Sequence, residues 1–320
     1  MKKVLKLTRT VLFILILAFV AGIILHQLFT AIEKKQNPSI GQYVDIDGKK
    51  MSLYSIGSGE HTIIMLPGLG TTSPILDFMP LAEELSKDNH VVIVEPFGYG
   101  WSDITSKERT IENEVKEIHA ALNAANIQGP YILMPHSISG LHSIYYANTY
   151  PDEVSGIIGI DCTLPRMPEY FEEDVPSKMP SAVGQLANLG VMRLLTLIAP
   201  DNFISDNSKG FYSDENLTLQ RHISSWKANN SNMIDQMNHI SDSIAKTHDM
   251  TFRSDLPLLF FTTDENDKTP RADGKTNVSF YESYLTNPSI QKVIPLNGSH
   301  YLHWSCKDEM CKQIKIMLNS

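Results

Sequence analysis

Uninterrupted apolar runs of four to six residues recur along the chain after residue 40, and longer segments with a different pattern separate them. An apolar run of this length is typical of a strand that is buried on both faces of a sheet. We therefore predict strands at 62–66, 91–94, 131–134, 156–160 and 256–261. Alternating apolar and polar residues at 43–47 and 50–56 predict a hairpin ahead of them.

The segments between these runs repeat apolar residues every three or four positions, as amphipathic helices do. One such face follows Ser73, the expected N-cap, and Pro74 is the expected first helical residue. A second face runs from Ile111 to Ala125. Strands that alternate with helices predict the α/β class, with a mostly parallel central sheet flanked by helices.

The stretch 164–252 is polar, rich in Met and Asn, and contains no strand-like run. We interpret it as a helical cap inserted between two parts of one core, 40–163 and 253–320. Within the cap, residues 186–198 are apolar on most sides. Two interpretations stay open: a helix packed inside the cap, or a lid wall that lines an acyl pocket or touches lipid.

The chain begins with a basic tail, 1–10, and an apolar segment, 11–32. No charge interrupts positions 11–25, and the length is near the ~20 residues that a membrane-spanning helix needs. A cleaved signal peptide is the alternative, but the bulky Phe19 stands two positions before Ala21, where a small residue is required. Because more cations precede the segment than follow it, we predict an uncleaved single-pass anchor in the cell membrane. Its N-terminus should be cytoplasmic and the remaining domain extracellular.

Composition narrows the possible partners. With 42% apolar and 20% charged residues, the chain has the balance of a folded protein. Residues 1–35 contribute +5 to a net charge of −9, so the remainder carries −14. A body this acidic repels phosphate backbones, so we expect no nucleic-acid partner. Three cysteines are too few for a disulfide framework.

A serine in a distinctive setting is the first candidate for chemistry. The predicted strand 131–134 runs into Pro-His-Ser-Ile-Ser-Gly and then into a helix with an apolar face. A serine between small residues at such a turn is typical of a nucleophile elbow, although Pro135 and Ser139 replace the usual glycines. The helix that follows points its N–H groups toward a developing oxyanion. Ser137 is therefore the candidate nucleophile.

Three further segments each follow a predicted strand and contain glycine, serine or histidine residues that could form a site. They are Leu-Pro-Gly-Leu-Gly at 66–70, Glu-Pro-Phe-Gly-Tyr-Gly-Trp-Ser-Asp at 95–103, and a run at 293–303 that places Gly-Ser-His just past a final strand. Together with the serine turn, this ensemble resembles the α/β-hydrolase superfamily with a helical cap, over residues 40–318.

The resemblance implies roles for particular residues. Ser137 corresponds to the nucleophile and His300 to the general base. The backbone amides of Leu69 and Ile138 correspond to the oxyanion hole. Pro67 stands where the family's oxyanion loop normally has histidine, but the main-chain amide supplies the hydrogen bond.

The acid of the triad has more than one candidate. Most family members carry it in a Gly-x-x-Asp turn after the strand that follows the cap, and strict alignment places Asn266 there, between Asp264 and Asp267. Some members take it from the strand after the nucleophile helix, where this chain has Asp161. We favour Asp161, because it needs no rearrangement to reach His300, with Asp267 second and Asp264 third.

Two motifs carry alternative interpretations. Gly-Leu-Gly-Thr-Thr-Ser at 68–73, with Glu95 downstream, resembles a dinucleotide fingerprint without its third glycine. His300 and His303 with Cys306 suggest a metal site, but no carboxylate pattern accompanies them. We therefore expect no cofactor and no metal.

The sequence thus predicts a serine hydrolase that cleaves carboxylic esters through an acyl-enzyme, with a small-molecule or lipid-like ester as substrate. Because the nucleophile is serine, the resemblance does not extend to dehalogenases and epoxide hydrolases, which use aspartate there. Peptidase, thioesterase and perhydrolase members keep the serine and stay open. A catalytically silent binding protein of the same fold is the alternative from a different class.

Overall fold

Eight strands form one sheet in the structure, a computed structural model that describes residues 2–264 and 273–319. The strands are β1 (Gln42–Ile46), β2 (Lys49–Ile56), β3 (Thr62–Leu66), β4 (His90–Glu95), β5 (Tyr131–Pro135), β6 (Val154–Ile160), β7 (Leu258–Thr263) and β8 (Gln291–Leu296). Their spatial order is β1-β2-β4-β3-β5-β6-β7-β8, in which β2 pairs antiparallel with β1 and β4 and all other pairs are parallel. The predicted mostly parallel sheet is confirmed, and each predicted strand ends within two residues of an observed one.

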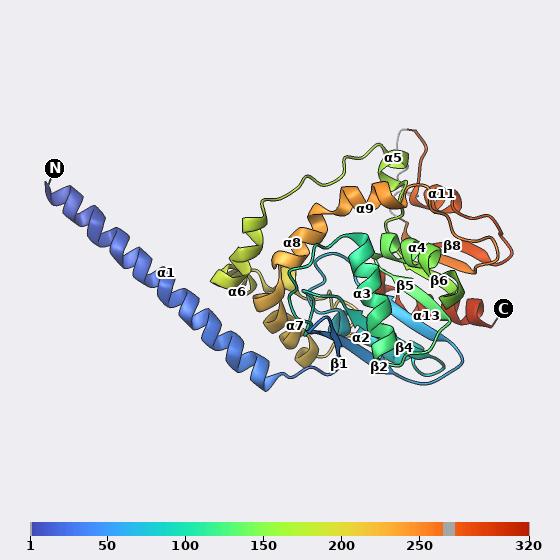
Figure 1. Ribbon diagram of the computed structural model, residues 1–320, viewed down its shortest axis with the longest axis horizontal. Coiled ribbons are helices and arrows are strands. Elements are labelled where there is room, and N and C mark those ends of the chain that lie inside the picture. The colour runs from blue at the N-terminus through green and yellow to red at the C-terminus, as the bar shows by residue number, and fades with distance from the viewer. Residues whose placement is uncertain (1, 265–272, 320) are drawn as a thin grey trace.

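Helices cover both faces of this sheet (Figure 1). One face carries α3 (Ile111–Ala124), α4 (Ser139–Thr149) and α11 (Asn277–Glu282), and the other carries α2 (Pro74–Leu85), α12 (Leu302–Ser305) and α13 (Lys307–Leu318). Successive strand residues alternate between the two cores, as Ile64 and Ile63 of β3 do. Pro74 begins α2 as predicted, but Ser73 makes no side-chain cap hydrogen bond.

Between β6 and β7 the described chain forms helices and irregular segments only. They are α5 (Met167–Phe171), η2 (Ser181–Leu189), α6 (Val191–Ile198), η3 (Pro200–Phe203), α7 (Asp214–Lys227), α8 (Ser231–Asn238) and α9 (Ile240–Thr247). The short helix η1 (Pro151–Glu153) lies outside this segment, directly before β6. The apolar stretch 186–198 is packed inside this insertion on one side only, through Ala187 and Met192. On α6, the side chains of Leu194, Leu197 and Ile198 are 58%, 73% and 70% exposed.

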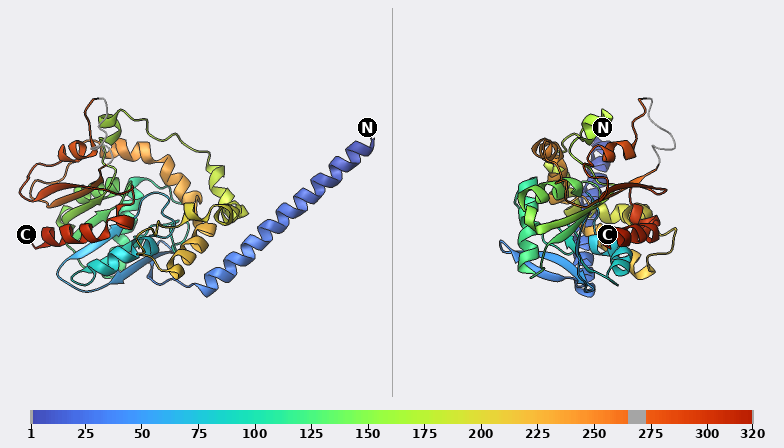
Figure 2. Two further views of the ribbon diagram at one scale, coloured as in Figure 1. Left: turned by 180° about the vertical axis from the view of Figure 1, so that it is seen from behind. Right: turned by 90° about the vertical axis from the view of Figure 1, so that its right-hand side faces the viewer.

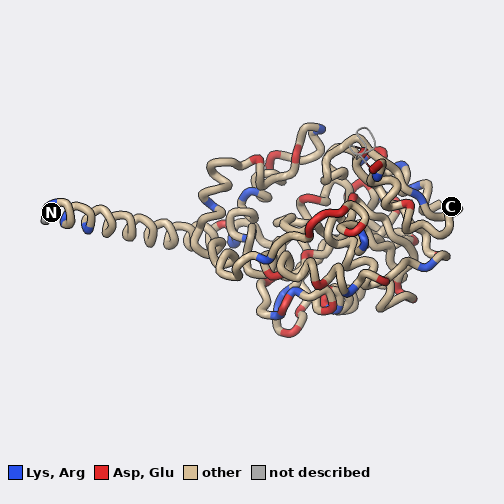
Figure 3. Tube along the Cα trace, turned by 90° about the horizontal axis from the view of Figure 1, so that it is seen from above, with Lys and Arg blue, Asp and Glu red and all other residues tan. Residues whose placement is uncertain are grey.

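The N-terminal apolar segment lies within one long helix, α1 (Lys2–Gln36), which projects from the body (Figures 1 and 2). Its cations lie at its two ends, and its middle carries no charge (Figure 3). Its most apolar window has a mean hydropathy of 2.6 and is only 6% buried. Among the described residues, this is the one continuous helix long and apolar enough to cross a membrane.

Candidate active site

Ser137 lies in the sharp turn between β5 and α4. Its φ is +52°, a left-handed conformation that costs strain for any residue with a side chain. Two backbone hydrogen bonds hold the turn: the Ser137 N–H donates to the Ile160 carbonyl (3.2 Å), and the Ser137 carbonyl accepts from the Thr163 N–H (2.8 Å). A Cβ at Gly140 would lie 2.3 Å from the Thr163 carbonyl oxygen, so only glycine fits at that position. The turn thus has the geometry of a nucleophile elbow.

The loop after β3 packs directly against this turn. The Ser139 hydroxyl donates to the Pro67 carbonyl (2.5 Å), and a Cβ at Gly68 would lie 3.0 Å from the Ser137 Cβ. Leu69 belongs to this loop, and Ile138 directly follows Ser137 at the start of α4. Among the described residues, neither amide donates a hydrogen bond to another group of the chain. Both are thus free to bind an oxyanion.

His300 lies in the loop between β8 and α12 and connects two of the candidate residues. Its Nε2 is 2.9 Å from the Ser137 Oγ, and its Nδ1 is 2.6 Å from the Asp161 Oδ2. The carboxylate requires a proton on Nδ1, which leaves Nε2 to accept the serine hydroxyl proton. The structure therefore brings Ser137, His300 and Asp161 into one hydrogen-bonded chain.

Asp161 follows β6 directly and has a φ of +40°. Its Oδ1 accepts from the Thr262 hydroxyl (3.1 Å) and from the Thr263 N–H (3.4 Å), so β7 fixes the carboxylate beside His300. Asp264 lies at the end of β7, where its N–H donates to the Leu296 carbonyl. Asp267 lies outside the described residues. Of the two candidate acids that the structure describes, Asp161 is the one hydrogen-bonded to the histidine.

His136, the residue before the nucleophile, is fully buried and bonds to the same loop. Its Nε2 lies 3.1 Å from the His300 carbonyl oxygen, so Nε2–H donates there. Burial, more than the neighbouring histidines, holds the pKa of His136 well below its ordinary value. The neutral ring thus holds the backbone of the loop that carries His300 without adding charge beside that residue.

A second buried network, which no local sequence pattern reveals, holds the segment that follows His300. The Asp77 carboxylate, on α2, accepts from His303 Nε2 (2.8 Å), Trp304 Nε1 (2.7 Å) and the Ser205 hydroxyl (3.0 Å). It therefore ties α12 and the cap to α2. Of the two histidines whose spacing suggested a metal, His303 belongs to this network and His300 bonds to Ser137 and Asp161. No group of metal-ligating residues occurs among the described positions.

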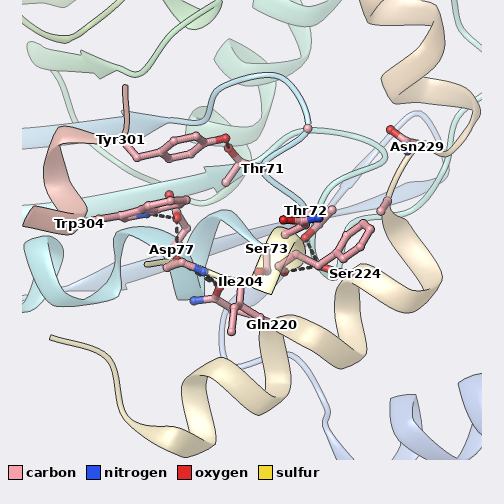
Figure 4. Close-up of a pocket in the computed structure, with 15 residues that line it drawn as sticks. Thr71, Thr72, Ser73, Asp77, Ile204, Gln220, Ser224, Asn229, Tyr301 and Trp304 are labelled. Atoms are coloured by element: carbon pink, nitrogen blue, oxygen red, sulfur yellow. Dashed lines mark hydrogen bonds between the residues drawn. The ribbon is translucent and has the colours of Figure 1, made fainter. Parts of the chain in front are cut away.

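A cavity of about 240 Å³ has walls from both the core and the cap (Figure 4). Ser137 does not line it, but two lining residues are next to site residues: Gly70 follows Leu69, and Tyr301 follows His300. In Figure 4 Tyr301 lies close to Thr71, and their hydroxyl oxygens are 3.4 Å apart. Cap residues, including Gln220 and Ser224 of α7, form the facing wall. The cavity therefore lies between the core and the cap.

Glu95, the acidic residue of the alternative fingerprint, is fully buried. It accepts from the Trp101 N–H (2.8 Å) and so closes the 95–103 loop. Burial raises the pKa of Glu95 to about 7, and burial lowers that of the nearby Lys227 to about 8. Lys227 donates to the Ser102 carbonyl. Glu95 is thus a structural group under the loop and does not face a ligand site.

A comparison with known families agrees with this architecture. Residues 61–305 match the family described as alpha/beta hydrolase fold. The chain belongs to the alpha/beta hydrolase fold family. The YbdG protein of Bacillus subtilis is 28% identical over 279 residues, which cover 85% of this chain and 83% of that protein. A 2-(acetamidomethylene)succinate hydrolase of Mesorhizobium japonicum is 33% identical over 125 residues, 39% of this chain and 43% of the relative.

Solved structures of alpha/beta hydrolases have the same fold. The Cif epoxide hydrolase of Acinetobacter nosocomialis superimposes with a TM-score of 0.67 at 16% identity, over 92% of this chain and 96% of that one. An enol-lactonase of Burkholderia xenovorans superimposes with a TM-score of 0.62 at 17% identity, over 87% of this chain and all of that one. At these identities the likeness concerns the fold alone.

Proposed function

We propose that this alpha/beta hydrolase cleaves carboxylic esters by acyl transfer to Ser137. The observation that carries the proposal is the chain of hydrogen bonds from Asp161 through His300 to the Ser137 hydroxyl, at 2.6 and 2.9 Å. A hydroxyl aligned on a neutral imidazole, itself oriented by a carboxylate, is the arrangement that activates serine as a nucleophile.

In the first half-reaction, Ser137 Oγ attacks the ester carbonyl while His300 Nε2 takes its proton. Asp161 stabilises the imidazolium that forms, and the amides of Leu69 and Ile138 donate to the oxyanion. His300 then gives the proton to the departing alcohol, which leaves an acyl-serine. In the second half-reaction His300 takes a proton from the water that attacks the acyl carbonyl. The bond from the acyl carbon to Ser137 Oγ then breaks, His300 returns the proton to Oγ, and the carboxylic acid leaves.

The choice of an ester rests on chemistry and on the names of similar proteins. The elbow carries serine, whose acyl-enzyme forms readily from esters. One structural neighbour is named an enol-lactonase, and a lactone is a cyclic ester. The 2-(acetamidomethylene)succinate hydrolase is also a hydrolase by name.

We also propose that α1 anchors the enzyme in the cell membrane with its N-terminus in the cytoplasm. The length, apolarity and exposure of α1 support a spanning helix, and the cations before residue 10 support this orientation. Protease added to intact cells should then release an active fragment that begins after Lys35. Activity that survives this treatment and appears only on lysis would contradict the orientation.

Labelling with a fluorophosphonate probe tests the activity. Only an activated serine reacts rapidly with such a probe, so the wild-type protein should be labelled and Ser137→Ala should not. Ser143→Ala is the matched control, because Ser143 lies buried in α4 with no hydrogen-bond partner for its hydroxyl among the described residues. Ester turnover should fall by on the order of 10³-fold or more in Ser137→Ala alone. A wild-type protein that stays unlabelled would favour a silent binding protein.

A further inference from the structure

An exposed apolar surface lies on the cap helix α6. The side chains of Leu194, Leu195, Leu197 and Ile198 are 41% to 73% exposed, whereas Met192 and Thr196 on the opposite side are buried. Met192 packs with Ala187 of η2 and Ala228, which follows α7. Helix α6 is thus fixed to the cap by one side and presents large aliphatic side chains on the other, which is unusual for a surface in contact with water.

Helix α6 is fastened to the anchor helix by Arg193. Its guanidinium forms a bidentate ion pair with Glu33 of α1, at 2.6 and 2.7 Å. The same side chain donates to His26 (3.1 Å) and Thr30 (3.1 Å). The guanidinium and carboxylate side chains are only 17% and 13% exposed. A shielded bidentate pair of this kind holds two helices in a defined orientation.

A close backbone approach strengthens this attachment. A Cβ at Gly190 would lie 2.8 Å from the His26 Cβ, so the start of α6 touches α1 directly. The Gln27 amide also donates to the Asn188 carbonyl at 2.9 Å. The contacts with α1 therefore include a backbone carbonyl of η2, Gly190 between η2 and α6, and the Arg193 side chain of α6.

The position along α1 shows at what depth α6 lies. His26, Thr30 and Glu33 share one face of the helix, at the end of its apolar segment, and all three are partners of Arg193. On the remaining surface of the same turns, Leu28 and Phe29 are 53% and 46% exposed. At the C-terminal end of the apolar segment of α1, the cap thus covers the polar side of the helix. The apolar side of the same turns stays exposed beside α6.

We propose that the exposed face of α6 inserts into the outer leaflet of the membrane that α1 spans. The inference rests on the proposed membrane anchor. We take lipid as the partner of this face because the exposed apolar side of α6 continues the open apolar face of α1. The two faces meet at the depth where a spanning helix leaves the hydrocarbon. Helices η2 and α6 are together long and apolar enough for a membrane span, but they are bent by 70° at Gly190. This shape suits a helix that lies in the interface and does not cross the membrane.

The insertion places the cap at the membrane surface. Helix η3 follows α6 directly, and its Phe203 lines the cavity between the core and the cap. Contact of α6 with lipid would thus hold one wall of that cavity next to the bilayer.

Quenching of tryptophan fluorescence by brominated lipid tests the insertion. The full-length protein is reconstituted into phosphatidylethanolamine–phosphatidylglycerol vesicles whose acyl chains carry bromine near the headgroup. Leu197→Trp and, independently, Ile198→Trp place the probe on the exposed face of α6. Ile316→Trp is the matched control, because Ile316 is an exposed aliphatic residue (49%) on α13, at the end of the body far from α1 (Figures 1 and 2).

We expect both α6 variants to lose more emission in brominated than in plain vesicles, beyond the loss of the wild-type protein. The Ile316→Trp variant should lose no more than the wild type. Equal quenching in the α6 variants and the control would overturn the insertion. Alkaline carbonate extraction of the same vesicles separates this failure from that of the anchor: a protein that stays in the membrane without extra quenching refutes α6 insertion alone. A protein that is extracted refutes both proposals.

Discussion

Replacing Asp161 by asparagine is the sharpest test of the proposed triad. The Asp161 Oδ1 already accepts two hydrogen bonds, from the Thr262 hydroxyl and the Thr263 N–H. An asparagine carbonyl oxygen will occupy that place, which turns the amide NH₂ toward His300 Nδ1, where the carboxylate now lies at 2.6 Å. Two donors would then face each other unless the imidazole proton moves to Nε2. In that tautomer His300 can no longer accept the Ser137 proton.

The size of the loss follows from this change of tautomer. An aspartate-to-asparagine change in a serine triad reduces turnover by about 10⁴-fold. A loss of that size corresponds to about 5.4 kcal/mol of activation free energy. The side chains are nearly isosteric and both hydrogen bonds from β7 remain, so the free energy of unfolding should change far less than turnover.

Hydrolysis of a short soluble ester by purified protein measures the effect, and urea unfolding checks the fold. Asp264→Asn, at the end of β7, and Asp267→Asn are the matched controls, and each should retain turnover within about tenfold of the wild type. The reasoning is refuted if Asp161→Asn stays within that range, and a large loss in either control would move the acid to that residue.

Three further outcomes follow from the structure. Asp77→Ala leaves the buried His303 Nε2–H and the partly buried Trp304 indole N–H without their acceptor, so urea unfolding should show a loss of about 3 kcal/mol in the free energy of unfolding. A loss under ~1 kcal/mol would contradict this role. Gly68→Ala places a methyl group 3.0 Å from the Ser137 Cβ, so ester turnover should fall by on the order of 10²-fold, and unchanged turnover would argue against the close packing. The Glu95 carboxyl has a pKa of about 7 in the folded chain and 4.5 ordinarily. Between these two pH values the folded chain binds the proton more tightly than the unfolded chain, so the free energy of unfolding falls as pH rises. In Glu95→Gln that fall, measured by urea unfolding at about pH 5 and about pH 7.5, should shrink by about 2 kcal/mol, and equal falls in both proteins would disprove it.

The sequence by itself determined the architecture of the body. Short apolar runs could be assigned to strands because a strand buried on both faces needs apolar side chains at every position. The turn after β5 was recognisable for a similar local reason. A serine at φ +52° between closely packed backbones requires small neighbours, and Gly140 and Ser139 are visible without a structure. The apolar segment within α1 was equally plain, because no charge interrupts it.

Only the tertiary structure decided which groups meet. Three aspartates had suitable positions in the chain, and the register of β6 against β7 brought Asp161 to His300. The Asp77 network could not be predicted, because its other members lie 128 to 227 residues from Asp77 in the chain and no local pattern links them to it. The pairing of Arg193 with Glu33 was hidden for the same reason. Local sequence fixes backbone preferences and patterns of burial, whereas a specific polar contact depends on how separate elements pack, and that is a property of the whole fold.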